Sequence, residues 1–171
     1  MINNNKYIKE YQINTEKSCY CVIETRSNEI CYFVKGNLII FYDLISKKDK
    51  CRIQGVSRGS GFNFMNMITK DLLLITGEGK ISIINVEKHN IVRIIDVPDS
   101  SKINVSCVLS QNEILTGDNN RKIKRWRIEG EDLRLISIRE NAHDNRIFTL
   151  IKLGDGHILS GSSNDGVIKI W

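Results

Sequence analysis

Three residue types that cooperate in hydrolytic enzymes lie near the C-terminal end of the sequence, as His143, Ser160 and Asp165. A serine can act as nucleophile, a histidine as its base and an aspartate as the group that orients the histidine. In α/β-hydrolases the serine occupies a G-x-S-x-G turn, whereas Ser160 stands in the apolar run Ile-Leu-Ser-Gly-Ser. The pattern therefore predicts no catalytic residue, and a hydrolase is kept only as the third functional alternative.

Metal and cofactor sites have little support in the sequence. The glycine-rich stretch 55–61 lacks the Lys-Ser/Thr ending of a phosphate-binding loop, so we expect an ordinary loop there. The cysteines include no C-x-x-C pair, which argues against a zinc site or a disulfide framework; they are Cys19, Cys21, Cys31, Cys51 and Cys107. We expect no metal, no cofactor and reduced thiols.

A basic stretch, RKIKRWR at 121–127, raises the possibility of nucleic-acid binding. In a strand, alternation would place Lys122, Lys124 and Trp126 on one face, where the tryptophan could stack on a base. The alternative is a structural strand whose basic side chains extend to solvent. Because the net charge is only +5, we favour the structural interpretation and keep a nucleic-acid-associated module as the second functional alternative.

Length and composition allow one globular domain with a real core, or two very small ones. The chain has 171 residues, of which 41% are hydrophobic and 26% charged, as in ordinary soluble proteins. The first residues, MINNNKYIKEYQ, contain no apolar signal core, and no apolar run approaches the ~18 residues of a membrane span. We expect an intracellular protein, cytoplasmic rather than nuclear, without membrane association.

The elements that must position these residues follow a repeat. Short apolar runs aligned on Phe41, Ile84, Trp126 and Trp171 recur every 42–45 residues, and a series of polar turns upstream of them has a similar spacing. Each repeat resolves into short strands rich in Ile, Val, Leu and aromatic residues, bounded by Asn, Asp, Gly and Ser. A four-stranded repeat of this length is typical of a propeller blade.

The sequence therefore predicts an all-β fold of about four four-stranded blades within one domain, 1–171. The predicted repeats cover 14–55, 61–98, 102–139 and 143–171. One such sheet has two apolar faces, which neighbouring sheets cover when the blades pack around a common axis.

The last repeat closely resembles a WD40 repeat, with His143 followed by ILSGSSNDGVIKIW. The third, ILTGDNNRKIKRW, is similar, whereas the first two match mainly in period, with Phe41 and Ile84 at the tryptophan position. The resemblance implies a hydrogen-bonded group that ties the strands of a blade together. Its members would be His143, Ser160 (or Ser162), Asp165 and Trp171 in the last repeat, and Thr116, Asn120 and Trp126 in the third.

The resemblance also raises the question of closure, because the tryptophan strand is third in a WD40 blade and a fourth should follow. Residues 6–13, KYIKEYQI, could supply it as a closing strand. Four repeats are fewer than in most members of the family. We expect an open arc or part of a longer propeller, and keep a dimer that pools eight blades and a closed four-blade ring as alternatives.

The function that the resemblance implies is a non-enzymatic scaffold that binds proteins or peptides, as one member of a complex. In the family, partners dock on a rim built by the loops before each inner strand and by the turns between second and third strands. We therefore expect a partner-binding rim of Arg58, Ser60, Asn119, Asn145, Arg146 and Asn164.

Overall fold

The computed structural model describes residues 11–56 and 64–171. Within these ranges the chain forms fifteen β-strands and a single 3₁₀ turn, η1 (Pro98–Ser100). No helix in these ranges is long and apolar enough to cross a membrane.

The strands form four antiparallel sheets in chain order, which we call blades 1 to 4. Blade 1 contains β1 (Cys19–Arg26), β2 (Glu29–Val34), β3 (Leu38–Asp43) and β4 (Lys48–Gln54). Blade 2 contains β5 (Phe64–Met67), β6 (Leu72–Thr76), β7 (Lys80–Asn85) and β8 (Asn90–Asp96).

Blades 3 and 4 follow the same order, but differ in strand number. Blade 3 contains β9 (Ile103–Ser110), β10 (Glu113–Asp118), β11 (Ile123–Glu129) and β12 (Asp132–Arg139). Blade 4 contains β13 (Ile147–Lys152), β14 (Ile158–Ser162) and β15 (Ile168–Ile170), and in the described residues no fourth strand pairs with β15.

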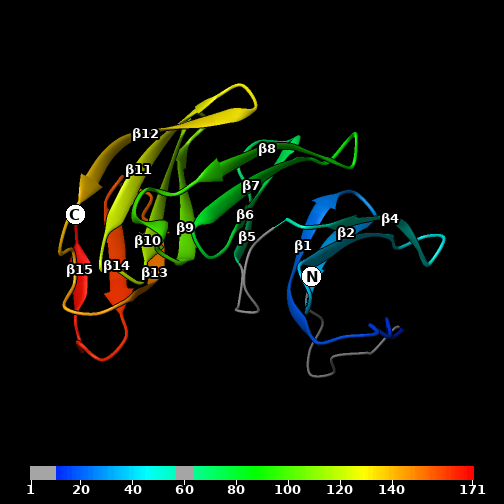
Figure 1. Ribbon diagram of the computed structural model, residues 1–171, viewed down its shortest axis with the longest axis horizontal. Helices are drawn as coiled ribbons and strands as arrows, with labels where there is room; N and C mark the ends of the chain where they lie inside the picture. Colours follow the sequence, from blue (N-terminus) through cyan, green and yellow to red (C-terminus); the bar gives the residue numbers. More distant parts are fainter. Residues whose placement is uncertain (1–10, 57–63) are drawn as a thin grey trace.

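The blades stand side by side in an open arc (Figure 1), with their first strands β1, β5, β9 and β13 in contact one after another. Blade 1 and blade 4 lie at opposite ends of the arc, and the C-terminus follows β15 of blade 4. This arrangement confirms the predicted all-β, open propeller. A closed four-blade ring is not formed, because blades 1 and 4 do not meet.

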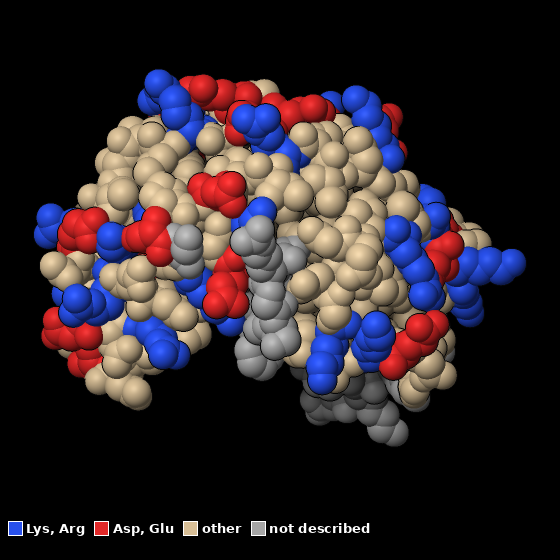
Figure 2. Space-filling view, viewed as in Figure 1, with Lys and Arg blue, Asp and Glu red and all other residues tan. Residues whose placement is uncertain are grey.

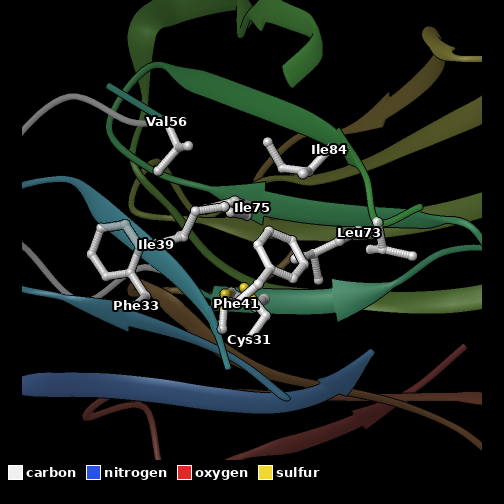
Figure 3. Close-up of a cluster of buried hydrophobic side chains, with 10 residues drawn as sticks. Cys31, Phe33, Ile39, Phe41, Val56, Leu73, Ile75 and Ile84 are labelled. Carbon is white, nitrogen blue, oxygen red and sulfur yellow. The ribbon is translucent and has the colours of Figure 1, made fainter. Parts of the chain in front are cut away.

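Apolar side chains fill the spaces between successive blades, as expected for sheets that are covered on both faces. Cys31, Phe33, Ile39 and Phe41 of blade 1 pack against a set of blade 2 residues that includes Leu73, Ile75 and Ile84 (Figure 3). A second cluster between blades 2 and 3 surrounds Trp126. A third joins Val105, Cys107 and Leu115 of blade 3 to Ile147 and Leu150 of blade 4.

The outer face of blade 1 is also apolar, and it is covered by the N-terminal segment. Tyr11 and Ile13 pack against a cluster of Tyr32, Val34, Ile40 and Tyr42. The described part of the expected closing strand, residues 11–13, thus lies on blade 1 and at the opposite end of the arc from blade 4. Residues 6–10 lie outside the described residues.

Candidate functional site

A chain of hydrogen bonds joins the four residues that the last repeat suggested. His143 Nδ1 lies 2.5 Å from Asp165 Oδ2, and His143 Nε2 lies 2.7 Å from Ser160 Oγ. The indole Nε1 of Trp171 donates to the same hydroxyl at 2.8 Å. The Ser162 hydroxyl donates to the carbonyl of Ser163 at 3.3 Å, so the hydroxyl that accepts the Trp171 indole N–H is that of Ser160.

In this series of hydrogen bonds, every donor meets an acceptor when His143 carries its proton on Nδ1. The imidazole then donates to Asp165 and accepts from the Ser160 hydroxyl, which in turn accepts from Trp171. Burial disfavours the charged carboxylate of Asp165, but the Val167 N–H, His143 and Ser162 outweigh that effect and hold its pKa below the usual value. Both His143 and Ser160 are fully buried, so the serine hydroxyl is not presented to a substrate.

Blade 3 has a matching bond between tryptophan and hydroxyl, but a buried lysine and its acidic partners stand beside it instead of a histidine–aspartate pair. Trp126 Nε1 donates to Thr116 Oγ1 at 2.9 Å, and both side chains are buried. The ammonium of Lys124 is buried and contacts Asp118, as well as Ser101 and Asp99 at 3.1 Å each. Lys124 is thus part of the interior and not of a solvent-exposed face.

Asp118, and not Asn120, supplies the carboxylate at the turn of blade 3. Its Oδ1 accepts the main-chain N–H groups of Asn120 and Lys122, both at 2.9 Å, and its Oδ2 accepts the Ser101 hydroxyl at 2.8 Å. Asn120 contributes its main-chain N–H, whereas its side chain is exposed. This differs from the expected role of Asn120, because the acidic residue lies at the end of the second strand.

Asp99 completes the polar cluster from the loop before β9. Burial opposes its ionisation, but Lys122 and Lys124 outweigh that effect and lower its pKa to about 2. Lys122 lies 2.7 Å from Asp99 and 3.1 Å from Glu140. The cluster therefore compensates the buried charge of Lys124 with two carboxylates.

Four of the five basic side chains of the stretch 121–127 are paired with carboxylates, whereas Arg121 is exposed. Arg125 and Arg127 both contact Glu113, at 2.5 and 3.4 Å, while Lys122 and Lys124 bind the acidic residues named above. On the face in view, basic and acidic side chains are interspersed (Figure 2). This pairing weakens the case for a nucleic-acid interface, because such an interface neutralises phosphates with Lys and Arg side chains and four of these cations already contact carboxylates.

The described part of the expected rim is connected by hydrogen bonds between blades 3 and 4. Asn104 Nδ2 donates to Asn119 Oδ1 at 2.9 Å and to the Ile147 carbonyl at 3.1 Å. The Arg146 carbonyl accepts the Ser163 N–H at 3.0 Å. Asn104, which the sequence reasoning missed, is a polar residue within an otherwise apolar first strand.

The rim side chains differ in exposure. Arg146 and Asn164 are exposed, while Asn119 and Asn145 are partly buried. The Asn145 side chain accepts the main-chain N–H of Arg146 at 2.8 Å. Asn164 has a φ of 62°, a left-handed conformation that asparagine tolerates better than most residues. Arg58 and Ser60, the other expected rim residues, lie outside the described residues.

A second buried polar cluster, also missed from sequence, joins blades 1 and 2. Glu29 is buried and contacts Thr25 and Lys50 at 2.8 Å each and His89 at 3.1 Å. Burial raises the pKa of Glu29, but hydrogen bonds from Lys50, Thr25 and His89 outweigh this and hold it below the usual value. The only sequence signal is an acidic residue at the start of an apolar strand.

The strand register also corrects the tryptophan position of blade 1. Trp126 pairs with Ile114 and Ile84 pairs with Leu73, each opposite the second residue of its partner strand. The same place in blade 1 is taken by Tyr42, which pairs with Ile30. Phe41, the expected occupant, faces blade 2 instead, because a shift of one residue reverses the face of a strand.

No protein-family model and no curated protein matches the sequence. Among solved structures, the computationally designed Ika4 protein matches with a TM-score of 0.73 and 15% identity, covering 92% of each chain. The RRP9 WD40 repeats match with a TM-score of 0.71 and 13% identity, over 93% of this chain and 49% of theirs. A chain of the mitotic checkpoint complex matches with a TM-score of 0.68 and 17% identity, over 84% of this chain and 45% of its own.

This chain spans about half the length of the latter two chains. At these identities the likeness shows the fold. Together with the blade topology and the repeat period, it establishes that this chain has the WD40-like β-propeller fold which its last two repeats indicate.

Proposed function

We propose that this chain is a non-enzymatic scaffold that binds proteins or peptides on the rim carrying Asn119, Asn145, Arg146 and Asn164. The observation that supports the proposal best is the hydrogen-bonded support beneath these residues. Asp165, His143 and Ser160 hold the β14–β15 turn that bears Asn164, and Asn104 connects Asn119 to the start of β13. A rigid rim binds at a lower entropic cost than a mobile one.

The same contacts count against hydrolysis by this site. A nucleophilic serine must reach a substrate carbonyl, whereas Ser160 is buried under Trp171 and bonded to two partners. The three residues of a catalytic triad are thus used to join strands and turns. Fold alone does not dictate function, so this argument depends on the burial of the site and not on the fold.

The rim chemistry favours a polar or acidic ligand. The Arg146 guanidinium is exposed and offers donors in a planar arrangement that suits carboxylates, and asparagine side chains both donate and accept. Binding by such groups is expected to be specific in geometry. Of the solved structures with this fold, one is described as the mitotic checkpoint complex and one as WD40 repeats, which agrees with the proposal.

A selection from a random peptide library with the purified chain, followed by calorimetric titration of the enriched peptides, tests the proposal. Arg146→Glu should weaken binding by about tenfold or more, since a charge-assisted hydrogen bond contributes roughly 1.5–3 kcal/mol. The matched control is Lys70→Glu, the same charge change at an exposed turn between the first two strands of blade 2.

Retained binding in Lys70→Glu together with weakened binding in Arg146→Glu is the expected result. Enriched peptides whose affinity is unchanged by both Arg146→Glu and Asn119→Asp would contradict the rim as the binding site. All three variants must unfold at the same denaturant concentration as the wild type. A loss of affinity can then be attributed to a lost contact with the peptide and not to a loss of folding.

A further inference from the structure

We propose that Arg121 and Arg146 form a two-point site for a peptide that carries two acidic side chains, and that Arg121 selects for the second of them. Arg121 lies in the β10–β11 turn that also bears Asn119. The site therefore belongs to the rim described above and rests on the proposed function, to which it adds the chemistry of the peptide and one contact residue.

Arg121 occupies a backbone position that favours glycine. A residue with a φ between 61 and 66° recurs in the turn between the second and third strands of each blade. In blades 1 to 4 it is Asn37, Gly79, Arg121 and Gly166, at the repeat period of 42–45 residues. Glycine adopts this left-handed conformation without strain and asparagine tolerates it, whereas other side chains crowd the main chain there. The arginine is thus the one occupant that local backbone preference does not explain.

The other residues at positive φ that are neither glycine nor asparagine each use their side chains. Lys47 Nζ lies 4.7 Å from the centre of a tyrosine ring, His89 lies 3.1 Å from a buried carboxylate, and Asp99 contacts two lysine ammonium groups. Such contacts offset the cost of the backbone conformation. The Arg121 side chain is exposed, and within residues 11–56 and 64–171 it makes no hydrogen bond, ion pair or ring contact. The geometry leaves its compensating contact to a bound molecule.

Arg146 is the other arginine of the described residues whose guanidinium has no partner. Its main-chain N–H and carbonyl are held by Asn145 and Ser163, whereas its side chain is exposed. Asp144, on the same loop, is also exposed and makes no ion pair with Arg121 or Arg146. The remaining described arginines contact a carboxylate or, in one case, a tryptophan ring; they are Arg26, Arg52, Arg93, Arg125, Arg127, Arg134 and Arg139. The two free guanidinium groups thus lie on neighbouring segments of one rim.

The spacing of the two arginines suits a short extended peptide. The Ala142 N–H donates to the Arg121 carbonyl at 2.9 Å, and the four residues from Ala142 to Arg146 span at most about 14 Å. Asn104 joins the two segments by bonding to Asn119 and to the main chain of β13. Acidic side chains roughly two to four positions apart on an extended peptide are separated by about 7–13 Å. One carboxylate can therefore reach each guanidinium, whose paired donors match it in geometry.

A random peptide library, selected in parallel on the wild type and on Arg121→Gly, tests the proposal. The wild type should enrich peptides with two acidic residues at the spacing given above, whereas Arg121→Gly should enrich peptides with a single acidic position. In calorimetric titration of one peptide enriched on the wild type, Arg121→Gly should weaken binding by about tenfold or more, as expected for one lost charge-assisted pair. Changing one of the two acidic residues of that peptide to glutamine should weaken its binding to the wild type but not to Arg121→Gly.

The stability of Arg121→Gly separates binding from folding. In urea denaturation this variant should be at least as stable as the wild type, because glycine adopts the same φ without strain. A structural role of Arg121 would instead lower the denaturation midpoint. The matched control is Lys47→Gly, which removes a cation at a similar φ of 57° from the turn between the third and fourth strands of blade 1. It should leave the affinity unchanged.

Different outcomes overturn the two-arginine site and the proposed function. Binding that is weakened by Arg146→Glu but not by Arg121→Gly would overturn the two-arginine site and leave the rim as the binding surface. A lower denaturation midpoint of Arg121→Gly, or Arg121-dependent binding of a single-stranded oligonucleotide and not of acidic peptides, would overturn it as well. Affinities unchanged by Arg146→Glu and by Asn119→Asp, or a selection on the wild type that enriches no peptide, would overturn the proposed function and the site with it.

Discussion

Trp171 donates its indole N–H to the hydroxyl of Ser160 at 2.8 Å, which ties the residue after β15 to the middle of β14. A matching bond joins Trp126 to Thr116 in blade 3 at 2.9 Å. An indole N–H without a partner is costly in the interior, where Trp126 is 1% exposed, and less so at Trp171, which is 39% exposed. Each bond joins two neighbouring strands. The polar residues of these repeats are therefore explained by the stability of the blade.

The buried ion pair of blade 3 should be strongly coupled. Lys124→Met leaves the Asp118 carboxylate buried without its cation, and we expect the free energy of unfolding to fall by about 3–5 kcal/mol. Adding Asp118→Asn should recover part of this loss, because the uncompensated charge is gone. Urea denaturation of both single variants and the double variant measures the coupling. If the losses of the two single variants simply add up in the double variant, the two side chains do not interact and the proposed ion pair is contradicted.

The ion pairs that Asp99 makes with Lys122 and Lys124 should make the free energy of unfolding depend on pH in the acid range. Its pKa is lowered from 3.8 to about 2, so the stability it contributes is complete above pH 3.8 and is lost as the pH falls through about 2. Asp99→Asn should therefore lower the free energy of unfolding at pH 7 by about 1–3 kcal/mol, and by progressively less below pH 4.

The control for this prediction is Asp96→Asn, which removes a carboxylate that is 86% exposed and contacts Lys80 at 3.5 Å. It should change the free energy of unfolding at pH 7 by less than about 1 kcal/mol. A difference between wild type and Asp99→Asn that stays constant from pH 7 to pH 2 would count against the assignment.

Gly117 should be required for the contact between blades 3 and 4. A Cβ at this position would lie 2.5 Å from Ile147 Cγ2 and 3.0 Å from Val105 Cγ1, so Gly117→Ala must displace the Ile147 side chain at the contact between the blades. We expect a loss of about 1–3 kcal/mol in the free energy of unfolding. Gly154→Ala, where a Cβ would meet nothing within 4 Å, should change it little; equal losses would refute the steric explanation.

The blade count and the positions of most turns could be predicted because period and turn residues are local features. The register of blade 1 could not: Phe41 and Tyr42 are both aromatic, and only the pairing of Tyr42 with Ile30 tells which of them faces blade 2. Sequence gives a strand its alternation, whereas the partner strand decides which set of side chains faces which neighbour.

The polar interior was harder to predict for a similar reason. Lys124 and Trp126 were correctly expected to share a strand face, yet a lysine there is usually solvated. Its burial depends on Asp99 and Asp118, which come from a loop and from another strand. The Glu29–His89 contact likewise joins residues of two blades. Such clusters depend on tertiary contacts that no local pattern reveals.

The central claim is that Ser160 joins strands and does not act as a nucleophile, and the free energy of unfolding of Ser160→Ala tests it most directly. The substitution leaves the indole N–H of Trp171 and Nε2 of His143 without their shared partner, so we predict a loss of about 1–3 kcal/mol. Ser163→Ala, in the turn that follows β14, should have little effect. A Ser160→Ala chain as stable as the wild type, or covalent labelling of Ser160 by a serine-hydrolase probe in the folded protein, would contradict the account.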